Sequence, residues 1–252
     1  MPFFTFTGVD DTTHLEDLTI INRALPFGIA IEWGVLYNTR LMGMPGYPTV
    51  SGFNTLVKNL SLERRFIPMS LHICGKDVSD FLKGEGQTSE IVGSFNRVQL
   101  NYQFSRYDIE LLTKTLAINE KTHRPIITQY NGENHRLWSE LWEYKNHQVL
   151  FDYSRGRGEI PLIWPKPIKG LFCGYAGGFT VDNLCHEIMR IQSTTNQYSY
   201  WVDIEEGVKN EEHRLDLSKV KECLRILEYF FNGICPNTPG CKYKGICGIS
   251  KM

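Results

Sequence analysis

Residues 170–208 have the sequence GLFCGYAGGFTVDNLCHEIMRIQSTTNQYSYWVDIEEGV, which contains one complete strand–helix–strand pattern. A β-prone run at 170–174 leads through a Gly-Gly pair to residues 183–192, where apolar side chains recur on one helical face. A second β-prone run follows at 200–205. Two β runs joined by a helix are typical of parallel strands with a crossover helix. This stretch therefore predicts an α/β fold built on a parallel sheet.

The same pattern extends along most of the chain. Eight β-prone runs lie at 3–8, 28–36, 66–74, 96–101, 125–129, 148–152, 170–174 and 200–205. Residues 14–25 and 220–231 also have the apolar spacing of helices. Residues 153–169 contain Pro161, Pro165 and Pro167, so no ordinary helix is expected there. Eight strands with crossover helices predict a single closed (β/α)8 barrel, a TIM barrel, and an open doubly wound sheet is the alternative.

The bulk composition narrows the class of protein. The chain has 252 residues, 42% of them hydrophobic, and a formal net charge of -1, so a nucleic-acid partner is not expected. No apolar run approaches the roughly 18 residues that cross a bilayer, and the first ten residues lack a secretion signal. Seven scattered cysteines suggest reduced thiols. We expect a cytoplasmic monomer or homodimer that has no membrane contact and no cofactor.

The last twenty residues differ from the rest in composition. We predict one barrel domain at 1–232 and a tail at 233–252 that contains cysteine, glycine and proline. Five residues separate Cys235 from Cys241, and five more separate Cys241 from Cys247. They could hold zinc or an iron–sulfur cluster with a fourth ligand, but the two-residue spacing of strong metal knuckles is missing. Incidental cysteines are the other interpretation, and we predict no metal site.

Polar side chains recur where the predicted strands end. In a barrel of this kind, the strand C-termini and the loops that follow them build the active site. The residues at these positions are Thr7, Glu32, His72, Cys74, Gln99, Asn101, Asp152, Asp203 and Glu205. We expect them to contact a ligand at one mouth of the barrel. The alternative is a hydrogen-bonded polar layer without a ligand.

Glycines after the seventh and eighth strands predict a phosphate site. Gly177 and Gly178 precede a helix, and glycines there let backbone amides approach an anion closely. Glu206 and Gly207 follow the eighth strand, and loops after strands seven and eight form the usual phosphate cradle of such barrels. A tight turn would also explain the Gly-Gly pair alone.

Five short motifs in order resemble those of phosphoribosylanthranilate isomerases. They are TFTGVD at 5–10, VQLN at 98–101, LFDYS at 150–154 followed by GRG at 156–158, YAGG at 175–178 followed by Asp182 and Asn183, and DIEEGV at 203–208. The matches cover most of the chain up to about Phe231. The resemblance implies a barrel that carries out an Amadori rearrangement of an N-linked phosphoribosyl compound, with Asp152 in the place of the general acid.

Several positions depart from the family pattern. Thr7 stands where the family has the cysteine that acts as general base, and a hydroxyl is a very poor base at neutral pH. Cys74 could substitute, or it could be an inert buried thiol.

The positions around the substrate's charged groups also differ. Glu205 and Glu206 replace serines that would help to hold phosphate, and Asn101 replaces a histidine. Arg40 is the nearest candidate for the arginine that binds the substrate carboxylate in the family.

Three functions remain open from the sequence. The first is an isomerase-like enzyme that acts on a phosphoribosyl compound or another phosphorylated sugar or nucleotide derivative. The second is a barrel that binds or sequesters such a phosphorylated small molecule without turnover, which the missing cysteine favours. The third is a metal-dependent barrel enzyme, with its ligands drawn from Glu32, His72, Asp152, Asp203 and Glu205.

Overall fold

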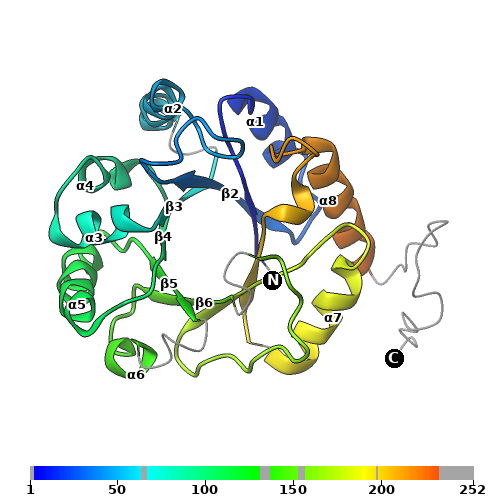
Figure 1. The fold of residues 1–252 in the computed structure, drawn as a ribbon. Helices are drawn as coiled ribbons and strands as arrows, with labels where there is room; N and C mark the ends of the chain where they lie inside the picture. Colours follow the sequence, from blue (N-terminus) through cyan, green and yellow to red (C-terminus); the bar gives the residue numbers. More distant parts are fainter. Residues whose placement is uncertain (1–2, 64–66, 131–136, 153–156, 197, 233–252) are drawn as a thin grey trace.

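Eight parallel strands close into a barrel in sequence order (Figure 1). The computed structural model describes residues 3–63, 67–130, 137–152, 157–196 and 198–232. The strands are β1 (Phe3–Thr7), β2 (Ala30–Tyr37), β3 (Met69–Cys74), β4 (Arg97–Asn101), β5 (Ile126–Tyr130), β6 (His147–Phe151), β7 (Phe172–Ala176) and β8 (Tyr200–Ile204). Because β1 pairs with both β2 and β8, the ring is complete. The predicted barrel is confirmed, and the open sheet is wrong.

Helices surround the barrel (Figure 1). They are α1 (Leu15–Arg23), α2 (Val50–Glu63), α3 (Lys76–Lys83), α4 (Thr88–Ile91), α5 (Arg106–Glu120), α6 (Leu137–Leu141), α7 (Leu184–Thr195) and α8 (Leu217–Phe231), with short 3-10 turns η1 (Val92–Ser94) and η2 (Glu206–Val208). The three helices expected from apolar spacing correspond to α1, α7 and α8. Local capping explains where α8 begins, since the Asp216 side chain accepts hydrogen bonds from the next turn's amides. In the part of the chain that the structure describes, no helix is both long and apolar enough to span a membrane.

The connection from β6 to β7 is an irregular strap. Its described part, residues 157–171, contains no helix, as the three prolines predict. Trp164 anchors it: the indole Nε1 donates to Glu187 of α7 at 2.8 Å, and the ring stacks on Phe179 with centroids 5.3 Å apart. The Tyr175 hydroxyl also donates to the carbonyl oxygen of Pro165 at 3.0 Å. These contacts hold the strap against the end of β7 and the loop after it.

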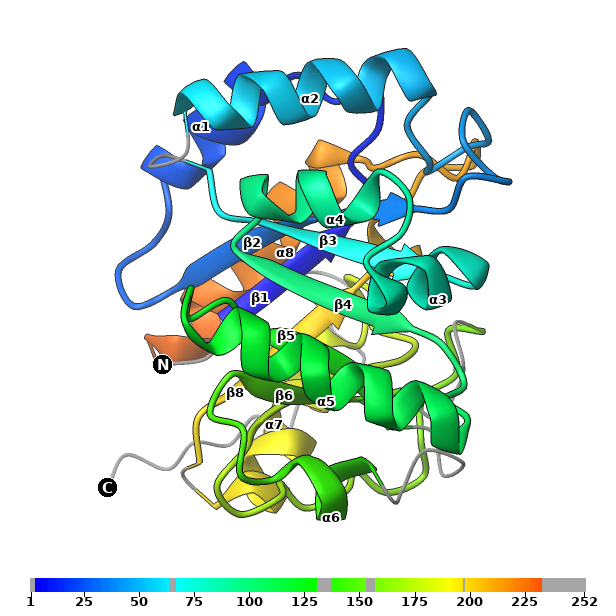
Figure 2. The same ribbon diagram turned by 90° about the vertical axis from the view of Figure 1, so that its left-hand side faces the viewer.

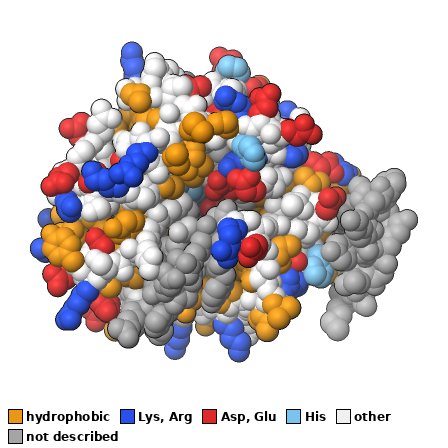
Figure 3. Space-filling model, viewed as in Figure 1, with side chains coloured by type: hydrophobic (Ala, Val, Ile, Leu, Met, Phe, Trp, Pro, Cys, Tyr) orange, Lys and Arg blue, Asp and Glu red, His pale blue; other side chains and the backbone are white. Residues whose placement is uncertain are grey.

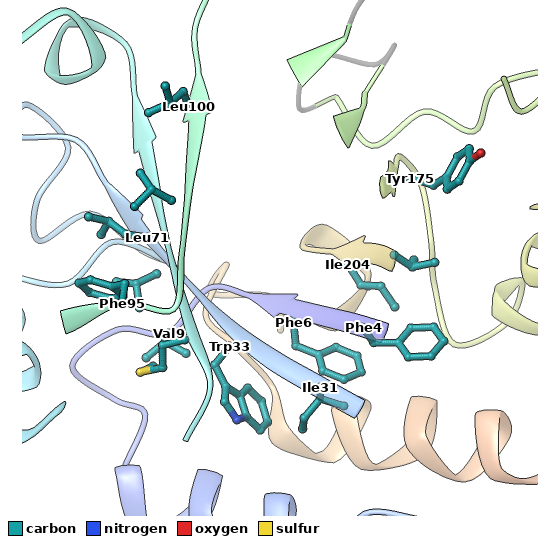
Figure 4. Packing of buried hydrophobic residues seen from close by; sticks show 14 of the residues in the cluster. Phe4, Phe6, Val9, Ile31, Trp33, Leu71, Phe95, Leu100, Tyr175 and Ile204 are labelled. Carbon is teal, nitrogen blue, oxygen red and sulfur yellow. The ribbon is translucent and has the colours of Figure 1, made fainter. Parts of the chain in front are cut away.

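The main core lies between the barrel wall and the helices. Phe4, Phe6, Trp33, Leu71 and Tyr175 are among its fully buried members (Figure 4). Burial of such large apolar side chains supplies most of the driving force for this packing, at about 25 cal/mol for each Å² removed from water. The strands' outward faces therefore fix the helices around the ring.

The barrel floor contains a buried ion pair. Glu32 was expected at a strand end. The strand β2 runs from Ala30 to Tyr37, so Glu32 is its third residue. It lies 2.7 Å from an Nη atom of Arg97, which begins β4. The guanidinium also donates to Thr5 and Gln148. The placement of Glu32 at the mouth is thus wrong, because Glu32 lies five residues before the C-terminal end of β2.

Aromatic rings complete the floor around this ion pair. The Arg97 guanidinium lies 4.7 Å from the centroids of both the Phe3 and the Trp201 rings. Gly174 makes room for Trp201, because a Cβ at that position would overlap the indole. Figure 2 shows β1, β3 and β4 pointing toward the same end, the one opposite this floor. That end is the mouth, where the strand C-termini gather.

Candidate active site at the barrel mouth

A cavity of about 220 Å³ opens at the C-terminal ends of the strands. Its lining comes from β4 to β8 and the loops that follow, and it includes Gln99, Asn101, Gln129, Asp152, Gly158, Gly177, Gly178, Thr180, Asp203, Glu205, Glu206 and Gly207. Figure 3 views this face and shows acidic side chains gathered near its centre. Most of the residues predicted from strand ends and glycine turns therefore lie around one space.

Asp203 lies on β8 at the base of the cavity. Its Oδ1 accepts a hydrogen bond from the Thr7 hydroxyl at 2.7 Å. Burial has the largest effect and raises the pKa of Asp203 to about 6, and the negative charge of Asp152 adds to that rise. Hydrogen bonds from Thr7 and Gln99 and the charge of Arg97 oppose it. A carboxylate with such a pKa can exchange protons near neutral pH.

Asp152 follows β6 and lines the same cavity. Its side chain is buried, and Oδ2 accepts a hydrogen bond from Gln129 Nε2 at 3.2 Å. Gln129 lies on β5 and was not predicted as a site residue, although it stands at a strand end like the others. Two buried carboxylates, one from β6 and one from β8, therefore share one cavity.

His72 is a neutral part of the layer beneath the cavity. Burial lowers its pKa to about 4. Its Nε2 is 2.9 Å from Ser70 Oγ, and its Nδ1 is 3.3 Å from Gln99 Nε2. Nδ1 is also 3.9 Å from Asp203 Oδ2. Because the imidazole is uncharged at neutral pH, that last contact is not an ion pair.

Cys74 and Asn101 end neighbouring strands, β3 and β4. Asn101 Nδ2 donates to Cys74 Sγ at 3.4 Å, and Gln99 Nε2 donates to Asn101 Oδ1 at 3.1 Å. Burial raises the pKa of Cys74 to about 12. The group is therefore a thiol at neutral pH, and a thiol is a poor base.

The loops after β7 and β8 touch each other beside the cavity. A Cβ on Gly207 would overlap the carbonyl oxygen of Phe179, and a Cβ on Gly177 would lie 2.6 Å from the carbonyl oxygen of Glu159. Gly177 and Gly178 also have positive φ angles of 132° and 59°. The glycines are thus required by close backbone packing between the strap and the two loops. This packing places the turns where such barrels have their phosphate site.

Lys209 forms ion pairs with the two glutamates that follow β8. Its Nζ lies 2.7 Å from both Glu205 Oε1 and Glu206 Oε1, and its side chain is 6% exposed. Burial alone would lower the pKa of Lys209, but the two carboxylates outweigh it and raise the pKa. Burial also raises the pKa of Glu205, although Lys209 opposes this rise. Lys209 was not predicted, yet its spacing of three and four residues from the glutamates was visible in the sequence.

The remaining predicted residues lie elsewhere or are not described. Arg40 is exposed on the loop after β2 and is not among the residues lining the cavity. Glu32 is at the opposite floor, so the five proposed metal ligands do not converge. No cluster of three or more His, Cys, Asp and Glu side chains suited to a metal occurs among the described residues. Cys235, Cys241 and Cys247 lie outside the described residues.

A larger hollow lies outside the barrel, between α1 and α2. It has a volume of about 1080 Å³ and is lined by residues such as Asp11, Glu16, Arg23 and Asn59. None of the predicted site residues lines it. Catalytic groups of a (β/α)8 barrel come from the strand C-termini, so the smaller cavity is the candidate site.

Comparisons with known proteins support the fold. No family model matches the sequence, and no curated protein matches it. The structure is similar to that of TrpF, a phosphoribosylanthranilate isomerase, from Jonesia denitrificans, with a TM-score of 0.58 and 15% identity over 92% of this chain and 98% of that one. It is also similar to ribulose-1,5-bisphosphate carboxylase/oxygenase from Pyrococcus horikoshii, with a TM-score of 0.53 and 11% identity over 92% of this chain and 60% of that one. The chain thus has the (β/α)8 fold of the family whose motifs its sequence resembles.

Proposed function

We propose that this barrel is an isomerase-like enzyme that acts on a phosphorylated sugar derivative, in the first place an N-linked phosphoribosyl compound. The observation that carries the proposal is the pair of buried carboxylates, Asp152 and Asp203, in one cavity at the strand C-termini. An aldose–ketose rearrangement needs one group that gives a proton to oxygen and one that removes a proton from carbon. The cavity holds two groups of this kind.

In this proposal Asp152 is the general acid. It protonates the ring oxygen of the ribose, so that the ring opens and the C2 proton becomes acidic. Gln129, which donates to Asp152 Oδ2 at 3.2 Å, holds the carboxyl group in place. Gln99 and Asn101 offer amide groups on the same side of the cavity, suited to the sugar hydroxyls.

The phosphate of the substrate is assigned to the loops after β7 and β8. Gly177, Gly178 and Gly207 line the cavity there. The carboxylates of Glu205 and Glu206 would repel a phosphate, but both are bonded to Lys209, which offsets part of their charge. Phosphate binding at this edge therefore depends on one lysine shared between two glutamates.

Turnover of N-(5-phosphoribosyl)anthranilate, followed by chromatography of substrate and product, tests the proposal. We expect Asp152→Asn to lower kcat/KM by at least about 100-fold, the usual contribution of a general acid. Asp17→Asn, a change of the same type on the exposed face of α1, is the matched control and should leave the rate unchanged. An Asp152→Asn enzyme as fast as the wild type would remove Asp152 from the mechanism.

Thr7 and Cys74 favour a second candidate, a barrel that binds a phosphorylated small molecule without converting it. Neither the hydroxyl nor the buried thiol can act as a base at neutral pH. Mass spectrometry of small molecules that copurify with the protein, before and after incubation, separates the two functions. A sugar phosphate recovered intact favours binding alone, whereas its conversion to an isomer favours the enzyme.

A further inference from the structure

We propose that Asp203 is the general base of this reaction and that Thr7 is the residue that positions it. The inference rests on the proposed function. It assigns the role of general base, which Thr7 cannot fill at the position of the family's cysteine. Thr7 is the last residue of β1, and Asp203 lies on the adjacent strand β8. Their 2.7 Å hydrogen bond puts a carboxylate beside the position where the resembling family has its base.

The other candidate bases at the mouth are excluded by their surroundings. Cys74 has a pKa raised to about 12 by burial and remains a thiol. His72 has a pKa lowered to about 4 by burial, so it is a weak base. Glu205 is bonded to Lys209 at 2.7 Å. Asp203 has no such cation within ion-pair distance among the described residues, and its carboxylate lines the cavity.

The groups that face Asp203 explain its proton affinity. They are Thr7 on β1, His72 on β3, Arg97 and Gln99 on β4, Asp152 after β6, and Glu205 directly after β8. Burial raises the pKa of Asp203 to about 6. When Asp152 carries the proton that it gives as general acid, its charge no longer raises the pKa of Asp203, so at pH 7 Asp203 is at least about nine-tenths ionised. Burial still raises the pKa, so Asp203 is a stronger base than an exposed aspartate. Hydrogen bonding from Thr7 keeps the pKa from rising further.

The proton transfers balance with these two carboxyl groups alone. Asp152 gives its proton to the ring oxygen, and the C1–O bond breaks to leave an iminium between C1 and nitrogen. Asp203 removes the proton from C2, and the electrons of that C–H bond form the C1–C2 double bond of an enolamine. Asp203 then returns the proton to C1, while the C2 hydroxyl returns a proton to Asp152 as the ketone forms. Substrate and product are isomers, and both side chains regain their starting states.

Replacement of the positioning residue tests the inference. Thr7→Val removes the hydroxyl at nearly constant volume, so the carboxylate loses a hydrogen bond to its charged form and its pKa should rise by about one unit. Thr7→Ser keeps a hydroxyl and should preserve the wild-type titration. Carboxyl ¹³C NMR of aspartate-labelled protein without ligand, with Asp203→Asn used to assign the resonance, measures the pKa directly.

The same variants should shift the pH dependence of kcat/KM for N-(5-phosphoribosyl)anthranilate. In wild type we expect the rate to fall tenfold per pH unit below about 6, and in Thr7→Val the fall should begin about one unit higher. A purely structural loss would lower the rate without moving the profile. Asp203→Asn, checked for folding by circular dichroism, should lower kcat/KM at least about 100-fold.

The outcomes separate this inference from the proposed function. Turnover that needs Asp152 but persists in Asp203→Asn would overturn the base assignment alone. So would an Asp203 resonance that titrates below pH 5, or a Thr7→Val profile that matches wild type. No turnover of the phosphoribosyl probe by the wild-type enzyme would remove the proposed function, and the base assignment with it.

Discussion

Removal of the Glu32 side chain should destabilise the barrel without changing ligand binding at its mouth. Glu32 and Arg97 form the floor, with side chains 2% and 8% exposed and their closest atoms 2.7 Å apart. Glu32→Ala would leave the Arg97 guanidinium buried without its carboxylate. Among the described residues, its remaining side-chain hydrogen bonds would be those to Thr5 and Gln148.

The expected magnitude follows from this geometry. Three N–H···O contacts of 2.7 to 3.1 Å join Arg97 to Glu32, and removal of one partner of a buried pair costs about 3–5 kcal/mol. We expect the free energy of unfolding to fall by that amount. For a domain of this size the fall corresponds to a loss of about 10 °C in Tm. The double variant Glu32→Leu, Arg97→Met removes both charges and should recover most of the loss.

Urea unfolding followed by circular dichroism measures the effect. Tryptophan fluorescence gives a second probe, since Arg97 lies over the ring of Trp201, one of five tryptophans. Ligand binding per folded molecule should stay at the wild-type level in Glu32→Ala, because neither Glu32 nor Arg97 lines the cavity. An unchanged free energy of unfolding, or a loss of ligand binding in a fully folded variant, would refute the placement of Glu32 in the floor.

Two further predictions concern pH and phosphate. Burial lowers the pKa of His72 and His147 to about 4. Below pH 6.5 the unfolded chain therefore binds more protons than the folded protein does. The free energy of unfolding should fall as the pH drops from 6.5 to 4, by up to roughly 3 kcal/mol per histidine. Urea midpoints at pH 7 and pH 5 test this, and a His147→Gln variant with the same acid dependence as wild type would contradict it. Replacement of Glu206 by Gln removes a half-exposed carboxylate beside the glycine turns and should tighten ribose 5-phosphate binding by roughly fivefold, about 1 kcal/mol. Calorimetric titration checks it, and unchanged binding in Glu206→Gln would place the phosphate elsewhere.

Local sequence patterns predicted the strands and part of the site. Each strand is a short β-prone run, and both Asp152 and Asp203 stand where such runs end, so both could be expected at the mouth. The run predicted at 28–36 and the observed β2 end within one residue of each other. Glu32 is in the middle of that run and not at its end, so the bounds of the run already placed it below the mouth.

The chemistry of the mouth depended on burial and on neighbours distant in the chain. His72 and Cys74 are both titratable residues at a strand end. Nothing in their local sequence says that burial lowers the pKa of the imidazole and raises that of the thiol, so that both are uncharged at neutral pH. The packing of Gly207 against Phe179 likewise requires two loops to meet. Such contacts cannot be derived from spacing along one segment.

The order of strands and helices is set by short-range patterns, since side-chain alternation and helical spacing act within a few residues. The pairing of Thr7 with Asp203 spans 196 positions and exists only because β1 and β8 join when the ring closes. Ring closure also withdraws both groups from water, which sets the proton affinity of the carboxylate. The barrel was therefore predictable from the chain, whereas the candidate base was decided by tertiary structure.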